Sequence, residues 1–323
     1  MNNLATHKLT LLVRLAVCLF SLACLPAVAV AQRGGGAVAL VPQRAVAIAK
    51  LNWNLVRSDA QFRSMLNANQ LDRALNDLNI NGSQISEIVI FSGINTTPSG
   101  LVGGIFDGSY DAAAVKASLE SRSFRKKNYL GRVLYCNDAD GSCTSLLRSG
   151  RLLVGTQQAV EGVIDVEANP RSALTLRKPF TTMLRKFVLG RQPISFAMAL
   201  PLEYQMVAEV GVKVVAALFN FSGLGPLGFV IDKIGLPQAI GFAITRSGSN
   251  FPVELTAKMK DEQSAALISG TFNLAQSLNF EMFASRMSAA DRDRLKNVSV
   301  VRQGTVLQLK ILLRSEDLQA PQR

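Results

Sequence analysis

The order of secondary-structure elements that the apolar pattern predicts runs through the chain twice. Each half reads as strand, helix, two strands, helix and strand, with Gly, Pro, Ser and Asn at the turns. Runs rich in Val, Ile and Leu indicate strands, and apolar residues spaced three and four apart behind a Ser or Asp cap indicate helices. The expected strands are 45–51, 85–91, 101–106, 129–135 and 151–154 in the first half, and 194–200, 239–245, 253–259, 298–301 and 306–313 in the second. The expected helices are 58–78, 110–121 and 157–166, then 203–221, 261–278 and a short one from Ser288.

This element order is that of the split βαβ, or ferredoxin-like, domain. It predicts the α+β class, with two tandem βαββαβ units whose sheets are mainly antiparallel and whose helices lie on one face. The expected divisions are a signal peptide at 1–31, a flexible segment at 32–43, a first unit at 44–168, a basic connector at 169–192, a second unit at 193–314 and a tail at 315–323. The halves share almost no residue identities, so a chance match of element order remains an alternative to duplication.

The first 31 residues have the three parts of a secretory signal peptide. Lys8 and Arg14 supply a basic start, 15–25 a mostly apolar run, and 29–31 the small-residue cleavage site Ala-Val-Ala. The run of 11 residues is too short to cross a bilayer, which takes about 20. We therefore expect an exported chain, periplasmic or extracellular. A lipoprotein site with Cys24 acylated is left open.

Histidine is absent from the expected mature chain, because the only one, His7, lies in the signal. This absence excludes a Ser-His-Asp triad, a Cys–His pair and a histidine metal site. No G-x-S-x-G motif is present, and the few acids have ready roles as caps and turn residues. We therefore expect a protein that is not an enzyme, without catalytic residues, cofactor or metal. Hydrolysis by Ser-Lys or carboxylate chemistry is the competing hypothesis.

Two cysteines remain after export, Cys136 and Cys143, on either side of a turn between two strand-like stretches. An even pair in an oxidising compartment predicts a disulfide across the mouth of this hairpin. Asn137, Asp138 and Asp140 in the same loop faintly resemble the ligands of a calcium loop. The later Glu of such a loop is missing, which favours a role of these oxygens in the turn itself.

Acidic residues are missing from 168–202, which carries six bases. Apolar residues between them predict a short amphipathic helix with a basic rim, suited to an anionic surface such as lipid headgroups. The alternative is a linker helix that packs its apolar side on one unit and leaves its charges in water. The six bases are Arg171, Arg177, Lys178, Arg185, Lys186 and Arg191.

The net charge of the expected mature chain is +10, from 33 Lys and Arg against 23 Asp and Glu. Solubility alone can explain such a charge. The partner stays unknown, but an anionic envelope component or lipid fits this charge, and we do not expect nucleic acid.

Residues 214–231 form a run of 18 without a charge, which is borderline in length for a membrane span. Gly and Pro at its centre argue against a lipid-exposed helix, so we expect no span in the mature chain. Two readings remain: a helix hairpin buried against the second sheet, or an apolar loop that dips into a bilayer or holds a lipid. The loop would project Leu224, Leu227 and Phe229.

The same run contains a G-x-G-x-x-G match at 223–228, with Arg246 after it as a candidate cation for a 2′-phosphate. Pro226 stands where backbone N–H groups should meet a pyrophosphate, so we expect no dinucleotide site.

In its layout of signal, Gly-rich start and strand-helix-strand-strand units, the chain resembles uncharacterised exported bacterial proteins with tandem α+β repeats. The resemblance implies an envelope location and no particular activity. We therefore expect an exported envelope protein with a binding or structural role, soluble or peripherally bound. A peripheral membrane or lipid-handling protein is the alternative.

Overall fold

The computed structural model describes residues 36–66, 68–93, 100–173, 178–199, 237–278 and 297–314. The chain divides into two compact units, Met1–Arg177 and Lys178–Arg323, each with its own strands and helices. The predicted signal, the C-terminal tail and the apolar run 214–231 lie outside the described residues. The predicted connector is divided, because the helix that begins at Lys178 packs within the second unit.

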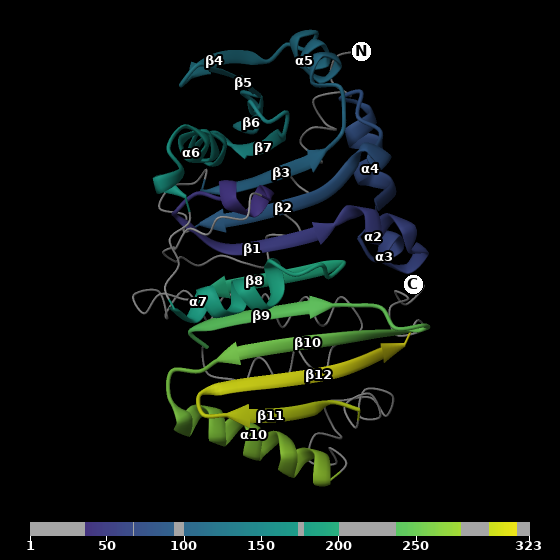
Figure 1. Cartoon of the computed structure of the whole chain (residues 1–323), viewed down its shortest axis with the longest axis vertical. Coiled ribbons are helices and arrows are strands. Elements are labelled where there is room, and N and C mark those ends of the chain that lie inside the picture. Colours follow the sequence, from purple (N-terminus) through teal and green to yellow (C-terminus); the bar gives the residue numbers. More distant parts are fainter. Residues whose placement is uncertain are drawn as a thin grey trace. The chain divides into compact units, whose positions relative to one another are not determined.

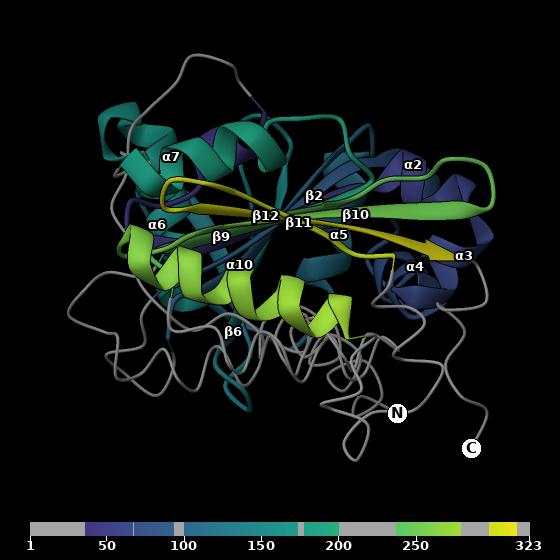
Figure 2. The ribbon, with the colours of Figure 1, turned by 90° about the horizontal axis from the view of Figure 1, so that it is seen from below.

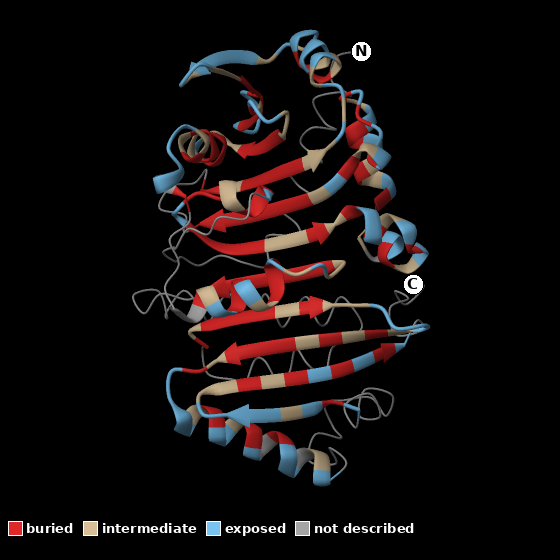
Figure 3. Ribbon diagram, viewed as in Figure 1, coloured by how far each residue is buried: buried red, intermediate tan, exposed pale blue. Residues whose placement is uncertain are grey.

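The described residues of the first unit form seven strands, each antiparallel to its neighbours within the unit, in the order β1-β2-β3-β7-β6-β5-β4 (Figure 1). They are β1 (Ala45–Asn52), β2 (Ile85–Gly93), β3 (Val102–Gly108), β4 (Arg125–Tyr129), β5 (Arg132–Cys136), β6 (Ser142–Leu146) and β7 (Leu152–Thr156). Most residues of strands β2 and β3 are buried (Figure 3). Strand β4 is an edge strand and its residues are mostly exposed.

Most of the described helices of the first unit begin at an Asn, Asp or Thr side-chain cap. They are η1 (Ala37–Leu40), α2 (Trp53–Ser58), α3 (Ala60–Met65), α4 (Ala68–Asn76), η2 (Gly82–Gln84), α5 (Ala112–Glu120), α6 (Gln157–Ala168) and η3 (Pro170–Ser172). In place of the expected helix 58–78, the chain forms three short helices, the first of which begins at Trp53. Asn52 caps the first of them, and Asp59 breaks it and caps the second by accepting a hydrogen bond of 2.9 Å from the Gln61 amide. Trp53 and Phe62 are fully buried in this unit's core.

In the part of the second unit that the structure describes, five strands follow in the order β11-β12-β10-β9-β8, again with antiparallel neighbours. They are β8 (Ile194–Ala199), β9 (Ala239–Ile244), β10 (Asn250–Lys258), β11 (Ser299–Gln303) and β12 (Val306–Arg314). The described helices are α7 (Lys178–Met183), which continues as the π-helical segment η4 (Leu184–Val188), and α10 (Glu262–Ser277). Helix α7 and α10 lie on opposite faces of this sheet (Figure 2). Among the described residues, no helix has the length and apolar character needed to cross a membrane.

The α+β class and the antiparallel sheets are confirmed, but the ferredoxin-like units are not. In a split βαβ, the strands on either side of the first helix are parallel and a third strand lies between them. Here β1 and β2 flank the first helices and pair directly and antiparallel, with Ile48 opposite Phe91. In the second unit β8 and β9 likewise pair directly, with Ala197 opposite Gly241. The order of elements along a chain does not determine which strands become neighbours, and both sheets use direct pairing.

Candidate functional site

Both units are basic over the full sequence, each with six more Lys and Arg than Asp and Glu, but among the described residues the excess lies mostly in the second unit. Its described residues carry ten Lys and Arg against three Asp and Glu, whereas those of the first unit carry fourteen against twelve. A surplus of one sign on one unit creates a field that attracts anionic partners to it.

The helix from Lys178 to Val188 is held on this unit by its apolar side. Phe180, Met183, Leu184 and Phe187 are buried, and the helix contacts β8 and β9. Gly241 on β9 makes this approach possible, because a β-carbon there would come within 2.3 Å of the Phe187 ring. The amphipathic helix predicted from the basic stretch is therefore present, and its apolar face is used inside the fold.

The basic rim of this helix faces the neighbouring strand β10. Lys186 Nζ lies 2.6 Å from Glu254 Oε1 and donates a hydrogen bond of 3.0 Å to Thr256 Oγ1. The side chains of Lys186 and Glu254 are 32% and 36% exposed, so solvent screens much of this ion pair. Its role is to position the end of the helix over β10. Arg185, one residue earlier, is exposed.

Beyond the helix, the same face of the sheet is open. Lys310 on β12 pairs across the strands with Glu254, and Ser299 on β11 pairs with Lys310, so their side chains lie on this face. Leu312, two residues further, is 49% exposed, and Val301 on β11 is 48% exposed. On this face of the sheet, none of the described helices covers the residues that β10, β12 and β11 contribute. We call these five residues together with Lys186 at the end of the helix (Lys186, Glu254, Lys310, Leu312, Ser299 and Val301) the basic shelf, because two bases stand beside one acid.

A shallow groove of about 390 Å³ runs between the end of the helix and the basic shelf. Its lining joins the charged side chains of Lys186, Glu254 and Lys310 to the apolar side chains of Phe187 and Leu312. The groove is partly open to solvent, so it does not exclude water as an enclosed catalytic pocket does. Cations beside apolar side chains on an open surface suit an anionic, amphiphilic partner.

The six predicted bases are divided between the two units. Arg185, Lys186 and Arg191 belong to the second unit, Arg171 lies in η3 of the first unit, and Lys178 begins α7. Arg177 and the predicted apolar tip (Leu224, Leu227 and Phe229) lie outside the described residues.

Lys310 and Leu312 were missed from the sequence, although a signal for them was there. Strand 306–313 alternates apolar and polar residues, and Leu312 is the apolar residue that breaks this alternation on the polar face.

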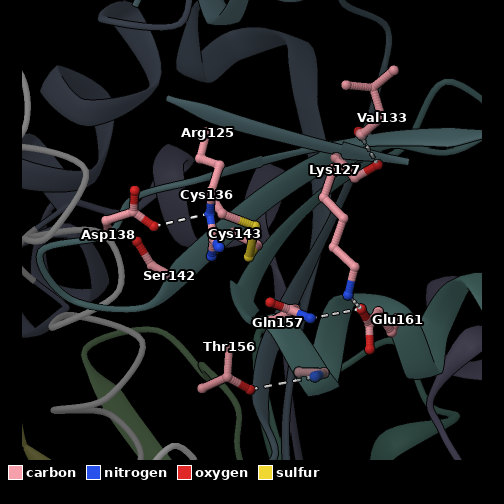
Figure 4. The surroundings of a disulfide bond; sticks show 12 residues. Arg125, Lys127, Val133, Cys136, Asp138, Ser142, Cys143, Thr156, Gln157 and Glu161 are labelled. Atoms are coloured by element: carbon pink, nitrogen blue, oxygen red, sulfur yellow. Dashed lines mark hydrogen bonds and ion pairs between the residues drawn. A yellow bond between two sulfur atoms is a disulfide. The ribbon is translucent and has the colours of Figure 1, made fainter. Parts of the chain in front are cut away.

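The predicted disulfide is present and lies in the first unit (Figure 4). Cys136 on β5 and Cys143 on β6 are cross-strand partners, bonded to each other and buried. The oxygens of the loop between them are engaged by nearby donors. Asn137 accepts a hydrogen bond from the Ala139 amide, Asp140 accepts from the Ser142 amide and hydroxyl, and Asp138 pairs with Arg125 at 2.9 Å. Within the described part of the chain, no cluster of three or more His, Cys, Asp or Glu residues is placed to hold a metal.

Other groups that sequence reasoning weighed have structural partners. Arg246, the candidate cation for a nucleotide phosphate, lies in the turn between β9 and β10. It donates a hydrogen bond of 2.8 Å to the Gly248 carbonyl and stacks 5.3 Å from the centre of the Phe251 ring. In the first unit, Asp107 pairs with Arg151 at 2.9 Å. These contacts account for the positions of Arg246, Asp107 and Arg151 without a bound ligand.

A Ser-x-x-Lys spacing, which sequence reasoning overlooked, joins Ser123 to Lys126. The lysine ammonium lies 5.8 Å from the centre of the Tyr135 ring, and both residues are exposed at the start of β4. A serine nucleophile needs a buried or desolvated lysine as its base. This exposed pair does not provide one.

No known family model and no curated protein matches the chain. Two solved structures are similar to it, crystal forms I and IV of TP0453. Form I aligns with a TM-score of 0.51 and 10% identity, over 88% of this chain and 95% of that one. Form IV aligns with a TM-score of 0.50 and 10% identity, over the same shares. At this identity the similarity concerns the fold alone.

Proposed function

We propose that this is an exported envelope protein, without enzymatic activity, whose second unit binds an anionic membrane surface. The observation that carries the proposal is the basic shelf, where Lys310 and the half-exposed Leu312 lie beside the Lys186–Glu254 pair on an open face. The unit that contains the shelf is basic as a whole, with 17 Lys and Arg against 11 Asp and Glu. Attraction of the bases to anionic headgroups would orient this face toward the bilayer.

A lipid surface fits this face better than a purely polar anionic polymer. Leu312 and Val301 are each about half exposed on the shelf. Apolar side chains next to cations gain from contact with the boundary between headgroups and acyl chains, where they leave water while the cations stay among phosphates. The apolar run 214–231 would add to this contact if Leu224, Leu227 and Phe229 insert as an apolar tip.

The test is flotation of the mature chain with vesicles of phosphatidylglycerol, compared with vesicles of phosphatidylcholine. We expect binding to the anionic vesicles only. Each basic side chain near such a surface contributes about 1 kcal/mol, so the double variant Arg185→Gln/Lys310→Gln should lower the affinity roughly thirtyfold. The control is Lys116→Gln/Arg148→Gln, which removes the same charge from exposed positions of the first unit and should leave binding nearly unchanged.

A second arm separates insertion from electrostatic attraction alone. Binding that survives moderate salt, but is lost in folded Leu227→Asp and Phe229→Asp proteins, would support the apolar tip. Absence of vesicle binding even at low salt would overturn the membrane proposal. Turnover of an ester, glycan or peptide that a single Ser, Lys, Asp or Glu substitution abolishes would overturn the non-enzymatic role.

A further inference from the structure

The basic shelf carries a cation that its neighbouring strands leave unpaired. Glu254 stands opposite Lys310 across the strands, but its carboxylate pairs with Lys186 on the helix, at 2.6 Å. Among the described residues, no acid forms an ion pair with Lys310, which is exposed. With Leu312 half exposed beside it, the shelf presents two bases, one acid and an apolar side chain to solvent. Such a face suits an acidic segment that also carries an apolar residue.

The chain supplies a segment of this kind directly after the shelf. The four residues that follow the end of β12 read Ser-Glu-Asp-Leu. Two adjacent acids, Glu316 and Asp317, are thus followed by Leu318, without a base among the next four residues. Two other stretches of the second unit that lie outside the described residues, 200–236 and 279–296, intersperse their acids with bases. The segment attached to the shelf is therefore the one whose charge complements it.

The tail is long enough to return over the shelf. Leu312 and Lys310 lie two and four residues before the end of β12, which corresponds to ~7 and ~14 Å along the strand. Three residues of extended chain span ~10 Å. A tail that turns back at Ser315 therefore returns Leu318 to the level of Leu312. From there the Asp317 carboxylate reaches the long side chain of Lys310.

We propose that the tail 315–323 folds back over the basic shelf, where Asp317 pairs with Lys310 and Leu318 packs on Leu312. The tail then covers the face that the proposed membrane function uses, so tail and membrane compete for it. The competition rests on that proposed function, whereas the contact between tail and shelf stands without it.

Attachment to the end of β12 selects the tail over a free acidic peptide. A segment on a short tether is present at its site at an effective concentration of about millimolar. One exposed ion pair and one leucine contact form a weak interaction, which such a concentration still populates. An anionic bilayer presents many charges at once and displaces the tail. The tail therefore sets how anionic a surface must be before the shelf binds it.

Disulfide formation between introduced cysteines tests the contact, because the native pair of the mature chain is already bonded. Ser299→Cys places one thiol on the shelf and Gln319→Cys places the other on the tail, so the proposed contact residues stay unchanged. The control pair uses Ser249→Cys instead, at an exposed position in the turn beside the end of β12, nearer to where the tail is attached. We expect the shelf pair to close at least roughly fivefold faster than the control pair. The preference should vanish in about 1 M salt and in the Lys310→Gln background. Equal rates for the two pairs at low salt would overturn the contact.

Flotation with phosphatidylglycerol vesicles tests the competition. Removal of 315–323, or the double variant Glu316→Gln/Asp317→Asn, should raise the affinity about tenfold, which corresponds to one uncovered base near the surface. The control Glu120→Gln/Asp138→Asn removes two acids of the first unit that are 44% and 67% exposed, so the net charge rises as in the tail variant. It should change the affinity by less than about twofold. Unchanged affinity of the shortened chain, together with faster closure of the shelf pair, would overturn the competition. If no variant binds vesicles while the shelf pair still closes faster, the proposed membrane function is wrong and the tail contact is supported.

Discussion

The Tyr129 hydroxyl donates a hydrogen bond of 2.8 Å to Asp165 Oδ1, and this contact ties the edge strand β4 to helix α6. Glu161 lies one helical turn before Asp165 on α6. It pairs with Lys127 of β4, with 2.6 Å between Lys127 Nζ and Glu161 Oε1 (Figure 4). Strand β4 is mostly exposed and has a paired neighbour, β5, on one side only. Contacts from helix side chains therefore supply much of what holds this edge in place. Its basic residues also discourage pairing with strands of other molecules.

The Tyr129–Asp165 hydrogen bond makes stability depend on pH in the alkaline range. The bond to Asp165 raises the pKa of Tyr129 from 10.0 to about 12, and burial adds to the effect. The contribution of the bond is thus full below pH 10 and is lost as pH rises toward 12. We expect Tyr129→Phe to cost about 1 kcal/mol at neutral pH and much less near pH 12.

Urea unfolding of wild type and Tyr129→Phe at several pH values checks this prediction, with the fluorescence of the single tryptophan, Trp53, as the probe of the first unit. The pKa values of Tyr110 and Tyr135 are raised as well, chiefly by burial, so both proteins lose stability in alkali. The difference in the free energy of unfolding between wild type and Tyr129→Phe therefore reports the contribution of Tyr129. A difference that stays constant from pH 8 to about 12 would contradict the assignment.

Leu130 occupies a backbone conformation that suits another residue. It follows β4 in a tight hairpin with φ at +46°, next to Gly131 at +73°, and its side chain is 56% exposed. The left-handed region costs a residue such as leucine roughly 1–2 kcal/mol, whereas Asn tolerates it. We expect Leu130→Asn to raise the free energy of unfolding by about 1 kcal/mol. Leu55→Asn, at a similarly exposed helical position, should lower it slightly, and a loss of stability in both proteins would count against strain at Leu130.

The types of element were predictable from the sequence, but their partners were not. Strand β2 is expected at 85–91 and runs from Ile85 to Gly93, because a buried run between turn residues has few alternatives. The disulfide followed from two cysteines on either side of one turn. The ferredoxin-like pairing did not follow, because direct antiparallel pairing of β1 with β2 satisfies the same apolar pattern.

The candidate site was predictable in part. The basic stretch indicated the amphipathic helix, and its apolar side packs on β8 and β9, as the linker-helix alternative expected, so it is not free to insert into a surface. The cross-strand position of Lys310 depends on the register between β10 and β12, which a single sequence does not specify. Leu312 was visible only as a break in an alternating strand.

Gly241 controls how the helix that ends at Val188 sits on the second sheet. An alanine there would place its β-carbon 2.3 Å from the Phe187 Cδ2 atom, in a buried contact that cannot move toward solvent. We expect Gly241→Ala to lower the free energy of unfolding of the second unit by about 1–3 kcal/mol, the usual cost of overpacking. Circular dichroism is the suitable probe, because Trp53 lies in the first unit. The control is Gly104→Ala, where the added carbon makes an ordinary contact of 3.4 Å with Phe106 and should cost much less. If the clash is the cause, Phe187→Leu in the Gly241→Ala background should recover part of the loss, although Phe187→Leu alone destabilises. Additive losses in the double variant would show that Gly241 and Phe187 act independently.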